Sequence, residues 1–151
     1  MQEEEQNIAF VMVNDLRIGS HLVMNDGACI ILAISIFKTG KHGCAKAHIT
    51  ARNIFTDKKV EGLYSTSEMV KVPIVTKKSY TLMNIYDEIE VSLLDEKLEC
   101  KNNLVKLDDS EVCKKTKKLF EEGKNVIVTL IIALNMSRIV EVTEEKETKT
   151  I

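Results

Sequence analysis

The side chains best suited to chemistry lie in one short cationic segment. It places three lysines and one histidine within nine residues and includes no carboxylate: Lys38, Lys41, His42 and Lys46. Gly40 and Gly43 flank the central pair, and because glycine adopts positive φ without steric cost, a tight reversal is expected to display Lys41 and His42 outward. Such a loop would attract phosphate. The alternative is an ordinary solvated hairpin turn, in which glycine and lysine are common.

Two known phosphate-binding motifs fit this segment poorly. A Walker A loop requires Ser or Thr directly after Gly-Lys, whereas His42 follows Lys41 here. The four residues from Gly40 to Gly43 match the GxxG of KH domains, but that motif belongs to a helical setting. Both flanks here have the pattern of strands, so the KH match carries little weight.

Two predicted strands must position the segment. The first is the continuous apolar run of residues 28–34. The second flank alternates between apolar and polar residues, which is typical of a half-buried strand. Its apolar residues are Ala45, Ala47, Ile49 and Ala51, and its polar residues are Lys46, His48, Thr50 and Arg52. We therefore expect His48 to be an ordinary surface histidine.

With its flanks, the segment resembles the eukaryotic translation factor 5A family, whose members carry hypusine and are the counterparts of bacterial elongation factor P. The resemblance rests on Lys-Thr-Gly-Lys-His-Gly at 38–43, Ala45-Lys46, and Asn-Ile-Phe-Thr-Asp-Lys-Lys at 53–59. Shorter matches extend over most of the chain, at Leu16-Arg17, Val72-Pro73, 91–94 and 126–129. The chain departs from the family pattern at Phe37, where a small polar residue is usual, and at Cys44, where histidine is usual.

The resemblance implies a role for Lys41. In the family the matching lysine receives a 4-aminobutyl group from spermidine and then a hydroxyl, which makes deoxyhypusine synthase and deoxyhypusine hydroxylase the implied partners. The modified protein binds the ribosome and reaches toward peptidyl-tRNA, where it promotes peptide-bond formation at stalling sequences and aids termination. The residues expected to contact phosphate, or to present the loop to the modifying enzymes, are Lys38, Thr39, Gly40, His42, Gly43 and Lys46. No other cofactor is implied.

The remaining sequence offers little for catalysis. His42-Gly43-Cys44 brings a histidine near a thiol, but on an expected surface turn without a pocket, so we do not expect an enzyme. The alternative function is a general single-stranded RNA-binding protein of the OB type. Tyr64, Tyr80 and Tyr86 are too scattered to indicate a base-stacking platform. A net charge of −2 argues against a polyanion-binding protein of the histone kind, and we expect no DNA partner.

Cysteine spacing and apolar runs indicate a cytoplasmic protein. Cys29, Cys44, Cys100 and Cys113 form no CxxC pair and no zinc spacing, which favours reduced thiols. The acidic first residues lack an apolar signal core, and the longest apolar run, 126–134, is too short to span a bilayer. We expect no membrane association.

Short strands and tight turns predict a mainly β fold in two domains. Residues 1–7 are expected to be a disordered acidic tail, and 8–72 a small barrel, SH3-like by the resemblance, that carries the Lys41 loop. The only proline, Pro73, marks the expected boundary. Residues 73–142 read as strands, one helix and further strands in the order of an OB-fold, and 143–151 as a disordered tail.

The expected helix has recognisable ends. Asp108 with Glu111 three residues later resembles a capping box, and Gly123 is placed to end the helix. Lysines at 114, 115, 117 and 118 are expected to form its solvated face.

Overall fold

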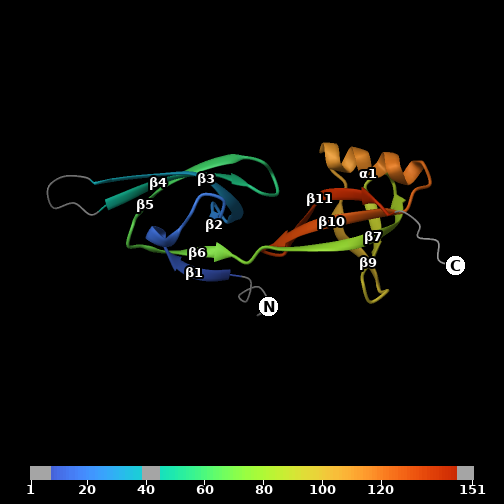
Figure 1. Ribbon diagram of the computed structural model, residues 1–151, viewed down its shortest axis with the longest axis horizontal. Helices are drawn as coiled ribbons and strands as arrows, with labels where there is room; N and C mark the ends of the chain where they lie inside the picture. The colour runs from blue at the N-terminus through green and yellow to red at the C-terminus, as the bar shows by residue number, and fades with distance from the viewer. Residues whose placement is uncertain (1–7, 39–44, 146–151) are drawn as a thin grey trace. The chain divides into compact units, whose positions relative to one another are not determined.

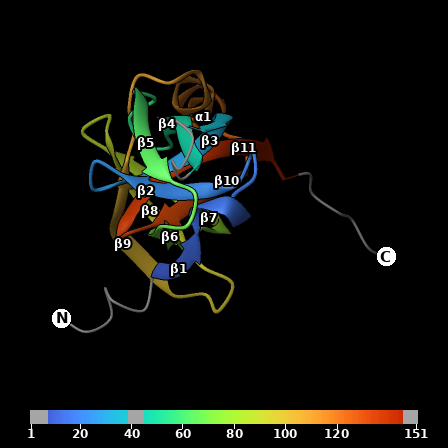
Figure 2. The ribbon, with the colours of Figure 1, turned by 90° about the vertical axis from the view of Figure 1, so that its left-hand side faces the viewer.

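Antiparallel hairpins build the N-terminal half of the chain in the computed structural model, which describes residues 8–38 and 45–145 (Figure 1). Its elements are β1 (Ile8–Met12), the 3-10 turn η2 (Val13–Asp15), β2 (His21–Met24), β3 (Gly27–Lys38), β4 (Ala45–Asn53), β5 (Lys59–Ser65) and β6 (Met69–Pro73). Strands β2 to β5 pair in sequence order, and β1 pairs with β6. Figures 1 and 2 both show β1 and β6 side by side. Asn25 and Asp26 make the β2–β3 turn with φ of 51° and 61°, as a type I′ hairpin requires.

The inner face of this sheet forms the first hydrophobic core. Ala47, Ile49 and Ala51 of β4 are fully buried, as their alternation predicted. They pack with Leu22 of β2 and Ile31 of β3 in one cluster that also includes residues of β6. Apolar packing therefore fixes the inner part of the hairpin that leads to the cationic segment, whereas Ile36 near its end is 58% exposed.

The C-terminal half forms a second core of its own. Its elements are β7 (Thr76–Tyr86), β8 (Glu90–Leu94), β9 (Cys100–Lys106), α1 (Glu111–Glu121), β10 (Val126–Ala133) and β11 (Met136–Glu144). The sheet order is β11-β10-β7-β8-β9, and the helix lies between β9 and β10 in the chain, which is the arrangement of an OB-fold. The predicted fold class is confirmed over the described residues: mainly β, with a barrel-like N-terminal half and a C-terminal OB-fold carrying one helix.

Tertiary contacts divide the chain into two units. The division falls between Val75 and Thr76, and the short segment Ala133–Met136 groups with the first unit. Pro73, where the sequence predicted the boundary, is the last residue of β6 and pairs with Ile8. The two clusters of buried residues share no member.

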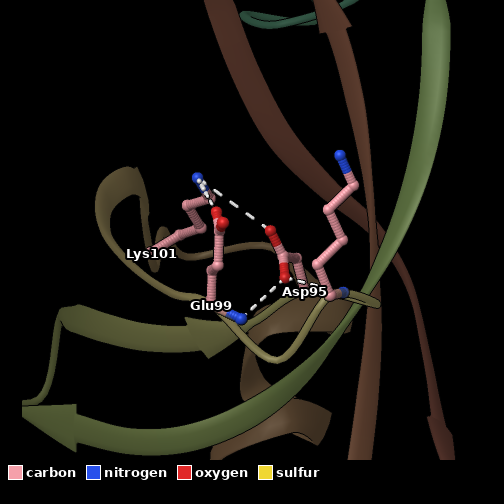
Figure 3. Close-up of polar contacts among 4 residues, drawn as sticks. Asp95, Glu99 and Lys101 are labelled. Atoms are coloured by element: carbon pink, nitrogen blue, oxygen red, sulfur yellow. Dashed lines mark hydrogen bonds and ion pairs between the residues drawn. The ribbon is translucent and has the colours of Figure 1, made fainter.

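One carboxylate organises the turn between β8 and β9 (Figure 3). Asp95 Oδ1 accepts hydrogen bonds from the backbone N–H groups of Lys97 at 2.9 Å and Glu99 at 2.8 Å. Lys101 Nζ lies 3.3 Å from Glu99 Oε2 and 3.9 Å from Asp95 Oδ2. The two backbone hydrogen bonds stabilise a turn in which Leu98 adopts a φ of 63°, a conformation that costs a non-glycine residue about 1–2 kcal/mol.

The helix begins two residues later than a cap at Asp108 predicted. The N-cap is Ser110, whose Oγ accepts a hydrogen bond from Cys113 N at 3.4 Å. Asp108 Oδ1 instead accepts a hydrogen bond from Ser110 N at 2.8 Å. Asp108 therefore positions the capping residue and does not itself cap the helix. Partial burial raises the pKa of Asp108, but hydrogen bonds from Ser110 and the nearby Arg138 outweigh it, and the pKa lies below its usual value. The predicted end is correct, since Gly123 follows the helix with a φ of 78°.

The last strand runs further than the sequence predicted. A disordered tail was expected from residue 143, but β11 continues to Glu144. Glu145 N donates to Asn125 O at 2.8 Å, and Lys124 Nζ lies 3.7 Å from Glu144 Oε2. These contacts continue the strand past its last apolar position. The predicted tail at 1–7 and the rest of the C-terminal one, 146–151, lie outside the described residues.

Candidate functional site

The β3–β4 hairpin places two of the predicted cations at its end. Lys38 is the last residue of β3 and pairs with Ala45, the first residue of β4. Lys46 follows and stands opposite Phe37. Lys41 and the other predicted loop residues, Thr39, Gly40, His42 and Gly43, lie outside the described residues, as does Cys44.

A pair of hydrogen bonds anchors the start of β4. Ala45 O accepts from Thr66 N at 3.1 Å and lies 3.3 Å from Thr66 Oγ1, which also donates to it. Thr66 belongs to the turn between β5 and β6, so β4 is bound on this side to the next hairpin. Ala47, two residues on, is fully buried. The strand is thus held in place almost to its first residue.

Within the described ranges, the cations at this end have no carboxylate partner. Among the described residues, neither Lys38 nor Lys46 forms an ion pair with a carboxylate. Glu61 of β5 is engaged by His48, with His48 Nε2 to Glu61 Oε1 at 3.1 Å, and Glu68 Oε1 accepts a hydrogen bond at 3.2 Å from the backbone N–H of Ser65, the residue opposite Lys46. His48 is therefore a partner of a surface carboxylate, in keeping with the ordinary role predicted for it. The positive potential at the hairpin end can therefore attract an anion.

Further cations lie on the face that carries Lys46, and sequence reasoning did not single them out. Arg52 of β4 stands directly opposite Lys59 of β5, and both are exposed. The alternation along β4 already predicted that Arg52 shares a face with Lys46. The opposition to Lys59 depends on the β4–β5 register, which the sequence does not specify.

No metal centre is found in the part of the chain that the structure describes, and two of its thiols are poor nucleophiles. No group of three or more His, Cys, Asp or Glu residues there could hold a metal ion. Cys29, Cys100 and Cys113 are free. Burial raises the pKa of the Cys29 and Cys113 thiols, which makes them poor nucleophiles at neutral pH. The described residues also contain no helix long and apolar enough to cross a membrane.

Comparison with known proteins places both halves in one family. Residues 9–68 match a family model described as translation initiation factor 5A-like, N-terminal, and residues 74–143 match one described as eukaryotic elongation factor 5A hypusine, DNA-binding OB fold. Eukaryotic translation initiation factor 5A-3 of Arabidopsis thaliana is 37% identical over 120 residues, which cover 80% of this chain and 76% of that protein. The Dictyostelium discoideum factor 5A is 37% identical over 132 residues, with 87% and 82% covered.

Solved structures of the same family are similar to this chain as well. A translation initiation factor 5A family protein from Naegleria fowleri superposes with a TM-score of 0.82 at 35% identity, covering 90% of this chain and 98% of the other. The factor 5A of Methanococcus jannaschii gives a TM-score of 0.72 at 25% identity, with 91% and 96% covered. The similarity thus extends through both units.

Proposed function

This chain belongs to the eukaryotic translation initiation factor 5A family, and we propose that it binds the ribosome and acts there through hypusine formed at Lys41. The family consists of translation factors and not of enzymes. In the proposed mechanism the modified side chain promotes peptide-bond formation on stalled peptidyl-tRNA and aids termination. The factor works in the cytoplasm, with residues 8–72 carrying the loop and 73–142 forming the OB-fold.

The observation that carries this proposal is the anchored hairpin with unpaired cations at its end. Lys38 and Lys46 flank the segment that contains Lys41, and among the described residues no carboxylate pairs with either. RNA phosphates supply the missing negative charge. A hypusine lengthens the lysine and adds a second amine, so that charge can enter an RNA cleft too narrow for the barrel. The flanking cations then position the factor while the long arm acts.

The modification itself requires two enzymes and one donor. Deoxyhypusine synthase transfers the 4-aminobutyl group from spermidine to the Lys41 amine, and deoxyhypusine hydroxylase adds the hydroxyl. The description of the family model that matches residues 74–143 includes hypusine, which supports this assignment. Gly40 and Gly43 shape the turn for these enzymes, with Thr39 and His42 as neighbouring contacts. The group is covalent, and no bound cofactor is needed.

The alternative, a general OB-type RNA binder, has weaker support. Such a protein stacks bases on exposed aromatic side chains of its OB-fold. Here Tyr80 is only 8% exposed and belongs to the core, which leaves Tyr86 as the exposed tyrosine of the described OB strands. The OB half therefore lacks a stacking platform in its described part.

The test compares two substitutions at Lys41. Lys41→Arg keeps a positive charge but cannot accept the aminobutyl group, and Lys41→Ala removes the charge. We expect both to abolish stimulation of a reconstituted translation reaction on a proline-rich message. In a parallel salt titration of RNA binding, only Lys41→Ala should lower the slope, by roughly one unit or less.

Two results would contradict the proposal. One is full stimulation by Lys41→Arg protein, which would show that charge alone suffices. The other is a proportional, modest loss in both assays, which would favour the general RNA binder. Peptide mapping of protein from its native cell should in addition find the modification on Lys41 and on no other lysine.

A further inference from the structure

The solvent face of the β3–β4–β5 sheet carries an ordered array of side chains. Residues opposite one another across antiparallel strands share a face, so the register assigns the rows. From the loop end inward the rows are Phe37–Lys46–Ser65, Ser35–His48–Leu63, Ala33–Thr50–Glu61 and, across β4 and β5, Arg52–Lys59. On the opposite face Ala47, Ile49 and Ala51 are buried in the core, whereas the side chains of this array are exposed or half-buried.

Two like charges on this face destabilise the sheet. Arg52 and Lys59 are direct cross-strand partners, and like charges in that position are destabilising. No carboxylate within the described ranges pairs with either one. Lys46 adds a third cation, whereas the face's acidic residue, Glu61, is engaged by His48. An anion placed between Arg52 and Lys59 would relieve their repulsion.

An exposed aromatic ring lies at the other end of the face. Phe37, near the end of β3, is 43% exposed. Its cross-strand partner is Lys46, and His48 is its diagonal neighbour one row inward. Alternate residues on one face of a strand are about 6.7 Å apart. Cations and rings at that spacing can follow successive nucleotides of an extended strand.

We propose that this face binds an unpaired stretch of RNA, with one base stacked on Phe37 and a backbone phosphate held between Arg52 and Lys59. The inference rests on the proposed function, which brings the chain to RNA, and it adds a contact surface that needs no hypusine. Lys46 contacts the phosphate of the stacked nucleotide. Leu63, 60% exposed in the neighbouring row, offers a separate apolar contact for a second base.

The chemistry of the face favours RNA over a protein partner. A protein-binding patch has a contiguous apolar centre surrounded by a polar rim. Here Phe37 of β3 and Leu63 of β5 are separated by Lys46 and His48 of β4. An exposed ring beside positive charges is characteristic of surfaces that bind single-stranded nucleic acid.

The test measures binding of a fluorescein-labelled oligoadenylate to the unmodified full chain. Phe37→Ala should weaken binding about 5- to 100-fold, the range found when a stacking ring is removed. An abasic oligomer of the same length separates bases from phosphates, and its affinity should not respond to Phe37→Ala. The matched control is Phe10→Ala, because Phe10 is 60% exposed but lies on β1, in the other sheet of this unit.

The phosphate contact is tested by salt dependence. Because both residues hold the same phosphate, Arg52→Gln and Lys59→Gln combined in one variant should reduce the slope of log affinity against log salt by about 0.7, the value for one single-strand phosphate. Unchanged oligoadenylate affinity in Phe37→Ala protein would overturn the proposal and leave the face to a protein partner. Equal losses for Phe37→Ala and Phe10→Ala would overturn it as well.

This outcome is independent of the Lys41 mechanism. The binding assay uses protein without hypusine, so a negative result leaves stimulation of translation by the modified factor untouched. Conversely, failure of Lys41 variants to affect translation would not alter the binding of oligoadenylate to the sheet face. Circular dichroism should show the native spectrum for each variant, since every substituted side chain is exposed.

Discussion

Among single residues, Gly27 must lack a side chain for a reason that the neighbouring sequence does not reveal. It is buried at the start of β3, and a Cβ there would overlap the side-chain amide nitrogen of Asn53. That amide is not free to move, because Asn53 Oδ1 accepts hydrogen bonds from Phe55 N at 2.8 Å and Thr56 N at 3.1 Å. Because Gly27 in the β2–β3 hairpin has no side chain, Asn53 can stabilise the turn of the β4–β5 hairpin.

Gly27→Ala should lower the free energy of unfolding by about 1–3 kcal/mol, since it displaces a side chain that satisfies two backbone N–H groups. Urea denaturation would measure this. In an Asn53→Ala background the same change should cost clearly less, because the overlapping amide is gone. Additive losses in the double variant would show that the clash with Asn53 is not the cause.

Residue types and spacing predicted which side of β4 faces the core, but not which residues oppose one another. Ala47 and Ile49 could be assigned inward from alternation alone. The pairing of Arg52 with Lys59 depends on the length and geometry of the β4–β5 turn, where Asp57 adopts a φ of 65°. A residue with positive φ that is not glycine leaves little trace in a sequence, so this part of the candidate face could be found only in the structure.

At the level of elements, the start of α1 shows how a local motif can mislead. Asp108 and Glu111 fit the spacing of a capping box, yet Ser110 is an equally good capping residue two positions later. The structure uses both: the Asp108 carboxylate binds Ser110 N, and the Ser110 hydroxyl binds Cys113 N. The existence of the helix was predictable from its apolar face and Gly123, whereas its first turn depended on a competition between two caps.

Ser110→Ala should therefore destabilise the OB-fold by about 1 kcal/mol, the usual cost of losing a serine N-cap. Thermal unfolding followed by circular dichroism would detect the shift. Asp109→Ala is the matched control, because Asp109 is the exposed neighbour and takes no part in the two capping hydrogen bonds, which join Asp108, Ser110 and Cys113. A loss at Asp109 equal to that at Ser110 would argue against Ser110 as the cap.

On the scale of the whole molecule, long matches to a family were more informative than composition. Charge and cysteine spacing only excluded classes of function, while the segment around Lys41 pointed to translation factor 5A, and comparison of both halves established that membership. The sequence also anticipated the order of strands and helix in each half, because turn residues separate nearly every pair of elements. Pairings between distant segments, such as β1 with β6, could not be derived from periodicity.

Two separate cores predict that the units can lose stability independently. Ile49 and Leu93 are both fully buried, the first in the N-terminal core and the second in the OB core. Truncation to alanine should cost about 2–5 kcal/mol at either site. In hydrogen exchange on the intact chain, Ile49→Ala should accelerate exchange of β2 to β5 while β7 and β8 keep their protection, and Leu93→Ala should do the reverse.

The control is Leu63→Ala, at a position 60% exposed, which should change neither exchange pattern. Acceleration throughout both units by either core variant would mean that they unfold as one cooperative body, because only then would a cavity in one core lower the opening free energy of the other.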